Sequence, residues 1–387
     1  MPSEPHDQNA DTDVAGRATP VEIFFDVVFV LTVIQLAGLL EHDLNWAGVG
    51  QTVLILGLLW YLYSGYVWLT NHVPPRRPVR KLLLFGGMAG FLLTAVAIPD
   101  AFTGSGLLFG VGYLIVVTVH VGLFSRSTHR PAVRRFAPYN LGGAALVIIA
   151  GLLTGPAVPV LWVAAIFTQS VLPFLLPGHS WVGAAASLHV RPAHFVERHG
   201  LLVIVALGET VVAIGMGARV DHLNPGVAGA VVMALALPAT LWWTYFTDTA
   251  AGEAALEQAD DATRTRLSAR VYNLTHFVLL LGIIATATGL HAVVAHSDTP
   301  AGWPAALALT AGVTLFLAAI ADLRHSVGVG RTTSRLATAA LVLASTPIGA
   351  SVNSALHLGV VIILMLVMLL IDGHRPGALT NLPGQYS

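Results

Sequence analysis

Long apolar segments with few charged residues recur along the chain, and this pattern restricts the possible folds more than any other feature of the sequence. Each segment is long enough to cross the hydrocarbon core of a bilayer, which is about 30 Å thick. The chain is 55% hydrophobic and only 10% charged, whereas a soluble domain carries roughly 25% charged residues. We therefore expect an all-α, multi-pass protein of the cytoplasmic membrane that is surrounded by the lipid bilayer. Twelve segments qualify as spans: 21–41, 49–70, 82–99, 105–124, 139–155, 158–176, 200–217, 226–247, 272–295, 303–322, 336–352 and 354–372.

The rest of the composition excludes several kinds of function. A formal net charge of −1 leaves no basic surface for binding nucleic acid. The absence of cysteine excludes disulfides, thiolate metal sites and cysteine nucleophiles. Residues 1–18 are polar and acidic, and they lack the basic start and short apolar core of a signal peptide. We expect a disordered cytoplasmic tail there, followed by a first helix that is retained as an anchor.

The positions of the basic residues give an independent test of the twelve spans. With the N-terminus in the cytoplasm, 18 of the 19 Lys and Arg residues fall on the cytoplasmic side and only Arg219 falls on the other. Cytoplasmic loops of membrane proteins carry such an excess of positive charge, so we predict that both termini are cytoplasmic. The cytoplasmic set is Arg17, Arg76, Arg77, Arg80, Lys81, Arg126, Arg130, Arg134, Arg135, Arg191, Arg198, Arg264, Arg266, Arg270, Arg324, Arg331, Arg335 and Arg375.

Two halves of the chain resemble each other. Val21-Glu22 opens the first predicted span, and Val196-Glu197 precedes the seventh. The second span ends in YVWLTN (66–71) and the eighth in WTYFTD (243–248), so two aromatic residues, a Thr and then Asn or Asp fall in the same register. An offset of six spans restores the same orientation, which predicts a parallel six-plus-six repeat, although aromatic residues at helix ends also form interfacial belts without a repeat. The predicted domains are tails at 1–18 and 374–387 and six-helix halves at 19–178 and 190–373.

Two carboxylates stand at the start of the first span. Glu22 and Asp26 are four residues apart, a spacing that places both on one face of a helix. Thr19 fits the N-cap and Pro20 fits the first helical position, so Glu22 falls at N3, where a capping-box carboxylate sits. Glu22 is therefore either a helix cap or a site residue. Asp26 lies deeper in an apolar run, where an unpaired charge is costly.

Glu209 is the residue that most strongly indicates an ion-binding site. It lies in the middle of the predicted span 200–217, where a charge costs roughly 2.5–3.5 kcal/mol on insertion scales. Such a residue is expected to face a bundle interior or an aqueous cavity. It either binds a proton or cation, or it is a neutral Glu that ties neighbouring helices together by hydrogen bonds.

Several other polar residues could complete an ion-binding site with Glu209 or Asp26. Asn71 and Asp248 end the second and eighth spans on the cytoplasmic side. Gln35 lies deep in the first span, and His276 lies about one turn inside the ninth. Each of these residues has an ordinary structural alternative as a hydrogen-bonding partner between helices.

The stretch from His189 to His199 contains a possible metal pair, His194 and Glu197, which we reject. The pair is three residues apart and does not form the His-Glu-x-x-His arrangement that places two imidazoles on one helical face. The nearby arginines, Arg191 and Arg198, also disfavour a cation. We expect instead a cytoplasmic helix start with Glu197 on its first turns. No motif for a nucleophile, a phosphate loop or a dinucleotide is present, so we expect neither an enzyme nor a cofactor.

Three groups of residues occur in order along the chain and carry a resemblance. The first is EIFFDVVFV (22–30) with Gln35-Leu36, the second is HFVERHGL (194–201) running into LGETVVAIG (207–215), and the third is LWWTYFTD (241–248) with YNLTH (272–276). They resemble the bacterial low temperature requirement A family, except that Thr247 separates Asp248 from the aromatic residues. The resemblance implies an integral membrane protein associated with growth at low temperature. It implies no particular substrate, catalytic residue or oligomeric state.

These observations favour membrane transport, by an ion- or proton-coupled carrier or by a channel. Glu209 would be the buried carboxylate, with Asp26 and His276 as partners near the cytoplasmic entry. The alternative is a non-transporting membrane factor that supports growth at low temperature through lipid or protein interactions. In that case the buried acids would be structural.

Overall fold

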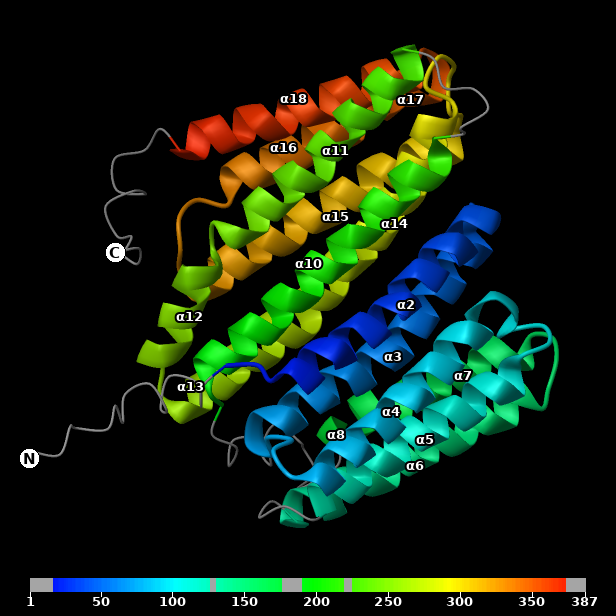
Figure 1. The fold of residues 1–387 in the computed structure, drawn as a ribbon, viewed down its shortest axis with the longest axis vertical. Coiled ribbons are helices and arrows are strands. Elements are labelled where there is room, and N and C mark those ends of the chain that lie inside the picture. Colours follow the sequence, from blue (N-terminus) through cyan, green and yellow to red (C-terminus); the bar gives the residue numbers. More distant parts are fainter. Residues whose placement is uncertain (1–16, 126–129, 176–189, 219–224, 374–387) are drawn as a thin grey trace, which may run out of the picture. The chain divides into compact units, whose positions relative to one another are not determined.

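The chain is helical throughout the part that a computed structural model describes, which comprises residues 17–125, 130–175, 190–218 and 225–373. No strand occurs within these ranges (Figure 1). The all-α prediction is confirmed. The helices form two compact units.

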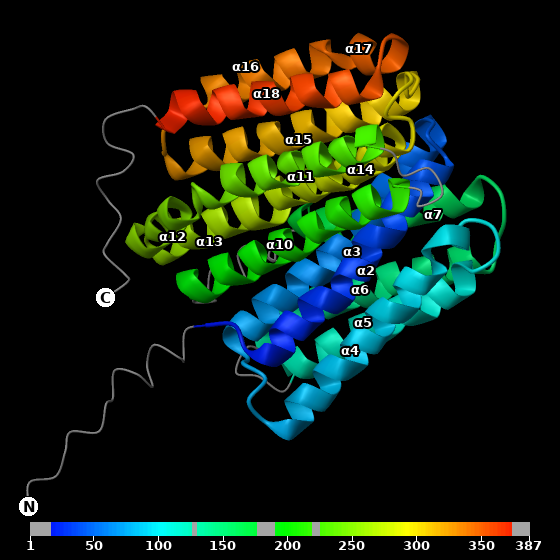
Figure 2. The same cartoon turned by 45° about the horizontal axis from the view of Figure 1, so that its top comes forward.

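The first unit contains the helices α2 to α8, helix α10 as far as Glu209, and the segment from Thr249 to Phe277. Helices α4, α5 and α6 lie side by side (Figures 1 and 2), and α2 packs on both α3 and α4. The bounds are α2 Pro20–His42, α3 Trp46–His72, α4 Pro78–Ala97, η1 Ile98–Asp100, α5 Gly106–Ser125, α6 Arg130–Gly151, α7 Ala157–Ile166, η2 Phe167–Val171, α8 Leu172–Leu175, α10 Pro192–Gly217, α12 Thr249–Gln258, α13 Asp261–Leu267 and η4 Ser268–Thr275.

The second unit contains the end of α10 from Thr210, helix α11, and the helices from Val278 onward. Helix α15 packs against α16 and α17, and α18 packs against α11, α16 and α17. The bounds are α11 Pro225–Phe246, α14 His276–Ala295, α15 Trp303–Val327, α16 Thr333–Ala344, α17 Thr346–Ser351 and α18 Ser354–Gly373.

Local sequence explains several helix ends. The Asn45 side chain accepts the first backbone N–H groups of α3, and the Asp260 side chain does the same for α13. Hydrogen bonds from Thr263 hold the pKa of the exposed Asp260 carboxyl below its ordinary value. Helix α15 ends at Gly328, which adopts φ +73°, a left-handed conformation that favours glycine.

Nine helical stretches within the described residues are long and apolar enough to cross a membrane. The other predicted segments, 139–155, 158–176 and 336–352, fall on α6, on α7 to α8, and on α16 to α17. A multi-pass helical protein is thus supported, and the count of twelve stays a prediction. The nine stretches are Pro20–His42, Trp46–His72, Pro78–Asp100, Gly106–Ser125, Pro192–Gly217, Ala228–Gln258, Asp261–Ala295, Trp303–Val327 and Ser354–Asp372.

Helix α10 begins well before the predicted span 200–217. It starts at Pro192, and a proline fits the first turn of a helix because its missing N–H is not needed there. The added turns contain His194 and Arg198, whose side chains are at most 2% exposed. A helix therefore starts in this stretch with Glu197 in its early turns, as predicted, and its first turns are packed within the first unit. As a consequence, Glu209 lies in the last third of the helix and not in its middle.

Two glycines bring α4 and α5 into close contact. A Cβ atom added to Gly112 would lie 2.8 Å from the carbonyl oxygen of Gly90 and 2.9 Å from the backbone nitrogen of Thr94. A Cβ atom added to Gly90 would lie 3.0 Å from the backbone nitrogen of Val116. Small residues at such positions allow two helices to pack at short distance inside a membrane.

The same arrangement recurs between α14 and α15 in the second unit. A Cβ atom added to Gly282 would lie 2.8 Å from the carbonyl oxygen of Gly312 and 2.8 Å from the backbone nitrogen of Phe316. Thr286 follows Gly282 by four residues, as Thr94 follows Gly90, and it also lies against the facing glycine. The two helix pairs therefore use the same residue types at the same spacing.

We predict that Gly112→Ala lowers the thermal unfolding temperature of the purified protein in detergent. The added methyl group meets backbone atoms, so the two helices must separate, at a cost of about 1–3 kcal/mol. The matched control is Gly38→Ala in α2, since no atom lies within 4 Å of the Cβ position there. Equal unfolding temperatures for the two variants would contradict the close packing of α4 and α5.

Candidate functional site

The centre of the candidate site is an ion-pair network between α2 and α10. Arg198 of α10 donates from Nε to Oδ2 of Asp26 at 3.1 Å and from Nη2 to Oδ1 of Asp26 at 2.5 Å. Its Nη1 donates to Oε1 of Glu22 at 3.2 Å. The three side chains are at most 1% exposed. Two carboxylates on one face of α2 thus share one guanidinium, as the four-residue spacing permits.

Glu22 is a helix cap, which is one of its two predicted roles, and it is also a member of the ion-pair network. Its Oε2 accepts hydrogen bonds from the backbone N–H of Thr19 at 2.8 Å and from the Thr19 hydroxyl at 2.7 Å. Its Oε1 faces Arg198 and His194. The capping box therefore fixes the carboxylate in the orientation that the ion pair needs.

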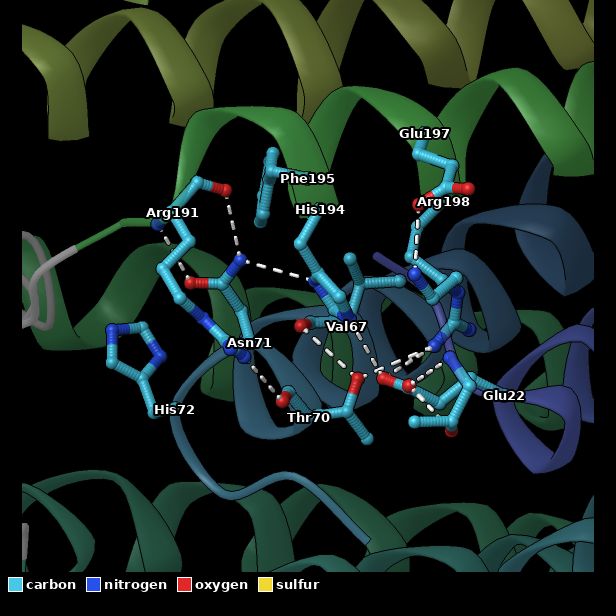
Figure 3. A network of polar contacts seen from close by, with 12 residues as sticks. Glu22, Val67, Thr70, Asn71, His72, Arg191, His194, Phe195, Glu197 and Arg198 are labelled. Atoms are coloured by element: carbon cyan, nitrogen blue, oxygen red, sulfur yellow. Dashed lines mark hydrogen bonds and ion pairs between the residues drawn. The ribbon is translucent and has the colours of Figure 1, made fainter. Parts of the chain in front are cut away.

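Helix α3 completes the surroundings of the network. The Tyr63 hydroxyl donates to Oδ1 of Asp26 at 2.7 Å, and the Thr70 hydroxyl accepts from Nη1 of Arg198 at 3.3 Å. Figure 3 shows Thr70 and Glu22 on the same side of Arg198. Three helices are therefore tied together by one buried guanidinium.

Asn71 determines which nitrogen of His194 carries the proton. The Asn71 Oδ1 accepts from the backbone N–H of Arg191 at 3.0 Å, which assigns its Nδ2 as the donor. That Nδ2 donates to the Arg191 carbonyl at 3.1 Å and lies 3.2 Å from Nδ1 of His194 (Figure 3). Nδ1 must then accept, so the proton of a neutral His194 is on Nε2, which donates to Glu22 at 2.9 Å.

Arg191 supplies a second positive charge beside the network. With His194 neutral, Glu22, Asp26 and Arg198 together carry a net charge of −1. Arg191 is half-buried, and its Nη2 donates to the Thr70 carbonyl at 3.3 Å. Burial lowers the pKa of Arg191, the Glu22 carboxylate opposes that shift, and the neighbouring Arg76 adds to it. The field of Glu22 therefore reaches Arg191, and the cluster as a whole is close to charge balance.

Glu209 lies in a different environment from Glu22 and Asp26. Its side chain is 5% exposed, and its Oε2 has no hydrogen-bond partner among the described residues. The charged group that acts on it is another acid, Glu41 near the end of α2. Neither Asp26 nor His276 contacts it within the described part of the first unit, so the predicted grouping of these three residues is not seen there.

Asp248 belongs to a separate cluster within the second unit. Its Oδ2 accepts from Nε of Arg324 at 2.6 Å and lies 3.8 Å from Nη2 of Arg335. Both arginines also form ion pairs with Asp372. Burial and the nearby Arg324 lower the pKa of Arg335 to about 10, so the guanidinium remains charged at neutral pH. Asp248 is therefore a paired acid at the end of α11.

Two further predicted residues have ordinary roles. Gln35 is half-buried and makes no hydrogen bond to another described residue. Glu197 accepts the backbone N–H of Ala18 at 2.7 Å, so it fixes the chain just before α2 (Figure 3). Neither residue joins the Arg198 network directly.

His276 lies at the end of a π-helical segment, η4, that connects α13 to α14. Its Nδ1 donates to the Val271 carbonyl, five residues earlier, at 2.8 Å. The Asn273 carbonyl accepts from the backbone N–H of His276 and also from Nε1 of Trp60, the latter at 2.6 Å. The Asn273 side chain accepts from the Ser64 hydroxyl at 2.5 Å. The π segment is thus joined to α3 by side-chain contacts, and such segments often occur at functional sites.

Two roles in the site are not evident from the sequence pattern: the pairing of Arg198 with Asp26 and the orientation of His194 by Asn71. Arg198 belongs to the predicted cytoplasmic set because the seventh span is predicted to begin at residue 200. The signal that could have found it is Pro192, a typical first-turn residue, followed by the apolar pair Phe195 and Val196, both of which are buried. The buried Arg335 was missed for the same reason.

Comparison with known proteins gives two matches. A family model described as bacterial low temperature requirement A protein (LtrA) matches residues 17–371. A protein of Rhizobium meliloti (strain 1021), described as uncharacterized protein RA0937, is 31% identical over 320 residues, which cover 80% of this chain and 77% of the relative. The family match includes every residue of the Arg198 network.

We predict that Arg198→Gln destabilises the protein strongly, because it leaves two buried carboxylates without their cation. Removing one partner of a buried ion pair lowers the free energy of unfolding by about 3–5 kcal/mol. The thermal unfolding temperature in detergent should fall sharply, and Arg134→Gln, at an exposed position, should leave it unchanged. Adding Asp26→Asn to Arg198→Gln should recover part of the loss. A double variant that is as unstable as the sum of the single variants would contradict the pairing.

We also predict that Trp60→Phe loosens the π segment. The change removes one of the hydrogen bonds that the half-buried Asn273 carbonyl accepts, and a typical hydrogen bond contributes about 0.5–1.5 kcal/mol. Amide hydrogen exchange in residues 268–276 should become faster. Trp46→Phe is the matched control because Trp46 is 85% exposed. Unchanged exchange in the Trp60 variant would show that this bond does not hold the segment.

Proposed function

The chain belongs to the bacterial low temperature requirement A (LtrA) family, and from that premise we propose that it moves protons or small cations across the membrane. It acts as a carrier or a channel and catalyses no chemical conversion. Glu209 is the carboxylate that receives the ion.

The observation that supports this proposal is the buried Oε2 of Glu209, which no described residue satisfies. Two other acids of the first unit can be compared with Glu209. Glu22 and Asp26 are also buried acids of the same unit, and both are paired with Arg198. A carboxylate that serves only to hold helices together is expected to resemble these two residues. Glu209 differs from them, because the charged group acting on it is Glu41, which repels it.

A charge in this position is costly, and the cost indicates what the residue binds. An unpaired charge inside a membrane span is disfavoured by several kcal/mol, and repulsion from Glu41 adds to the penalty. A proton or a small cation that binds to Glu209 removes the charge and the repulsion together. Intramembrane acids that are retained without a protein partner are typical of ion pathways and proton relays.

We further propose twelve crossings with both termini cytoplasmic, arranged as two six-helix halves. The distribution of basic residues supports the orientation. The matched helix pairs support the repeat: Gly90, Thr94 and Gly112 of the first half correspond to Gly282, Thr286 and Gly312 of the second. Carriers are commonly built from two such repeats.

A second candidate function rests on a different observation. The networks around Arg198 and Arg324 are closed clusters of paired charges, which is what a purely structural role for the acids requires. In this alternative the chain is a non-transporting membrane factor that supports growth at low temperature through lipid or protein interactions. Measurement of ion flux separates the two functions.

The test is ion flux in proteoliposomes that contain the full-length protein. We predict that Glu209→Gln abolishes proton or cation flux. The variant should still insert into the membrane and elute from a size-exclusion column as the wild-type protein does. The amide keeps the shape of the side chain but removes its ability to bind a cation or to gain and lose a proton. Glu257→Gln, at an exposed position of α12, should transport normally.

Two results would overturn the proposal. Full flux in the Glu209→Gln variant would show that this carboxylate is not the ion site. Absence of flux in the wild-type protein, across a panel of protons, sodium and potassium, would favour the non-transporting alternative.

A further inference from the structure

Four basic residues form a compact surface where α3 ends and α4 begins. We call Arg76, Arg77, Arg80 and Lys81 the basic corner. Arg76, Arg77 and Lys81 are exposed, and Arg80 is half-exposed, with its Nη1 donating to the Pro74 carbonyl at 3.3 Å. The four residues lie within six positions of the sequence, so their charges are close together.

No acid among the described residues pairs with the basic corner. No Asp or Glu occurs between Asp43 and Asp100, and none of the four residues forms an ion pair with a described residue. The corresponding connection after α11 differs, because it contains acids and its Arg264 pairs with Asp261 at 2.9 Å. The basic corner therefore differs from that connection, whereas Arg134 and Arg135 of α6 also lie in a stretch without acids, from Asp100 to Glu197.

Two nearby features add to the positive potential. Arg76 acts repulsively on Arg191, the half-buried base beside the Arg198 network. Helix α4 starts at Pro78, directly within the basic corner, and the positive end of its dipole favours an anion at that point. An anionic group bound there would offset the repulsion between Arg76 and Arg191 and would interact favourably with the dipole of α4.

An apolar stripe runs along α4 away from the basic corner. Val79, Leu82 and Phe85 are 56%, 69% and 45% exposed, and their spacing places them on one side of the helix. Phe24 of α2 is 51% exposed, and its ring centroid lies 6.2 Å from that of Phe85. A charged surface at a helix end thus continues directly into an apolar surface along the same helix.

We infer that the basic corner and the stripe of Val79, Leu82 and Phe85 form a binding site for an anionic phospholipid. The phosphate group lies against Arg76, Arg77 and Lys81, and an acyl chain lies along the stripe. The combination of unpaired cations with an adjoining apolar face matches the two parts of such a lipid, and clusters of basic residues beside a membrane helix attract anionic lipids. The site does not depend on the transport function proposed above.

The experiment is native mass spectrometry of the full-length protein in detergent with added lipid. We expect retention of phosphatidylglycerol and much weaker retention of phosphatidylcholine with the same acyl chains. The variant R76Q/R77Q/K81Q should bind phosphatidylglycerol about 10- to 100-fold more weakly, since each basic residue near the surface contributes substantially to attraction. The matched control is R134Q/R135Q/R331Q, which removes three other exposed arginines and should bind as the wild type does.

A second pair of variants keeps every basic residue and so avoids any effect of charge on membrane insertion. Leu82→Asn interrupts the apolar stripe and should weaken phosphatidylglycerol binding, whereas Leu108→Asn, at a 40% exposed position of α5, should not. Conservative replacement, R76K/R77K, should retain most of the binding.

Three results would overturn the inference. Equal retention of phosphatidylglycerol by the wild type and R76Q/R77Q/K81Q would show that the basic corner does not bind it. Equal retention of phosphatidylcholine by the wild type would show that the negative charge is not recognised. Displacement of the lipid by inorganic phosphate at equal concentration would show that the site binds a free anion and makes no use of the acyl chain.

Discussion

The pairing of Arg198 with Glu22 and Asp26 is the interaction on which the first unit depends. A guanidinium and two carboxylates are all removed from solvent, and each alone would be strongly disfavoured inside an apolar bundle. Arg198 and Asp26 are 172 positions apart in the sequence, so the pair fixes two distant helices against each other. Because a guanidinium donates in fixed directions, the pairing also sets the rotation of α10 about its own axis. The positions of His194 and His199 follow from that rotation.

Among the described residues, both units contain a buried cluster of arginine and acidic side chains. Asp248, Arg324, Arg335 and Asp372 in the second unit are paired among themselves, as Glu22, Asp26 and Arg198 are in the first. Such clusters specify which helices pack together, because a wrong pairing would leave a charge alone in an apolar setting. Glu209 stands outside both clusters. Among the described buried acids, those in the two clusters are paired with arginine, whereas the Oε2 of Glu209 has no hydrogen-bond partner.

The sequence predicted the all-α fold and the positions of the apolar helices because both depend on local hydropathy. It also identified the capping role of Glu22, since a capping box is defined by residues three positions apart. It did not identify Arg198 as the partner of Glu22 and Asp26. A count of basic residues treats every arginine near a predicted loop as solvated, and no local pattern reveals a partner so distant in the chain. The predicted span 200–217 begins later than α10 for a related reason: the turns that carry His194 and Arg198 are buried, and only tertiary contacts make that extension stable.

The π segment η4 changes how the sequence of this region has to be compared with that of relatives. Its hydrogen bonds span five residues, as the contact from His276 to Val271 illustrates, so one more residue is accommodated than in an α-helical turn. A helical wheel drawn with a single period through α13, η4 and α14 assigns the residues on one side of the segment to the wrong face. A relative that lacks one residue between positions 268 and 275 could keep both flanking helices intact with an ordinary α-helical turn in place of the π turn. A single-residue gap in an alignment at this point would thus mark the loss of the π turn and of its hydrogen bond with Trp60, and not an error of alignment.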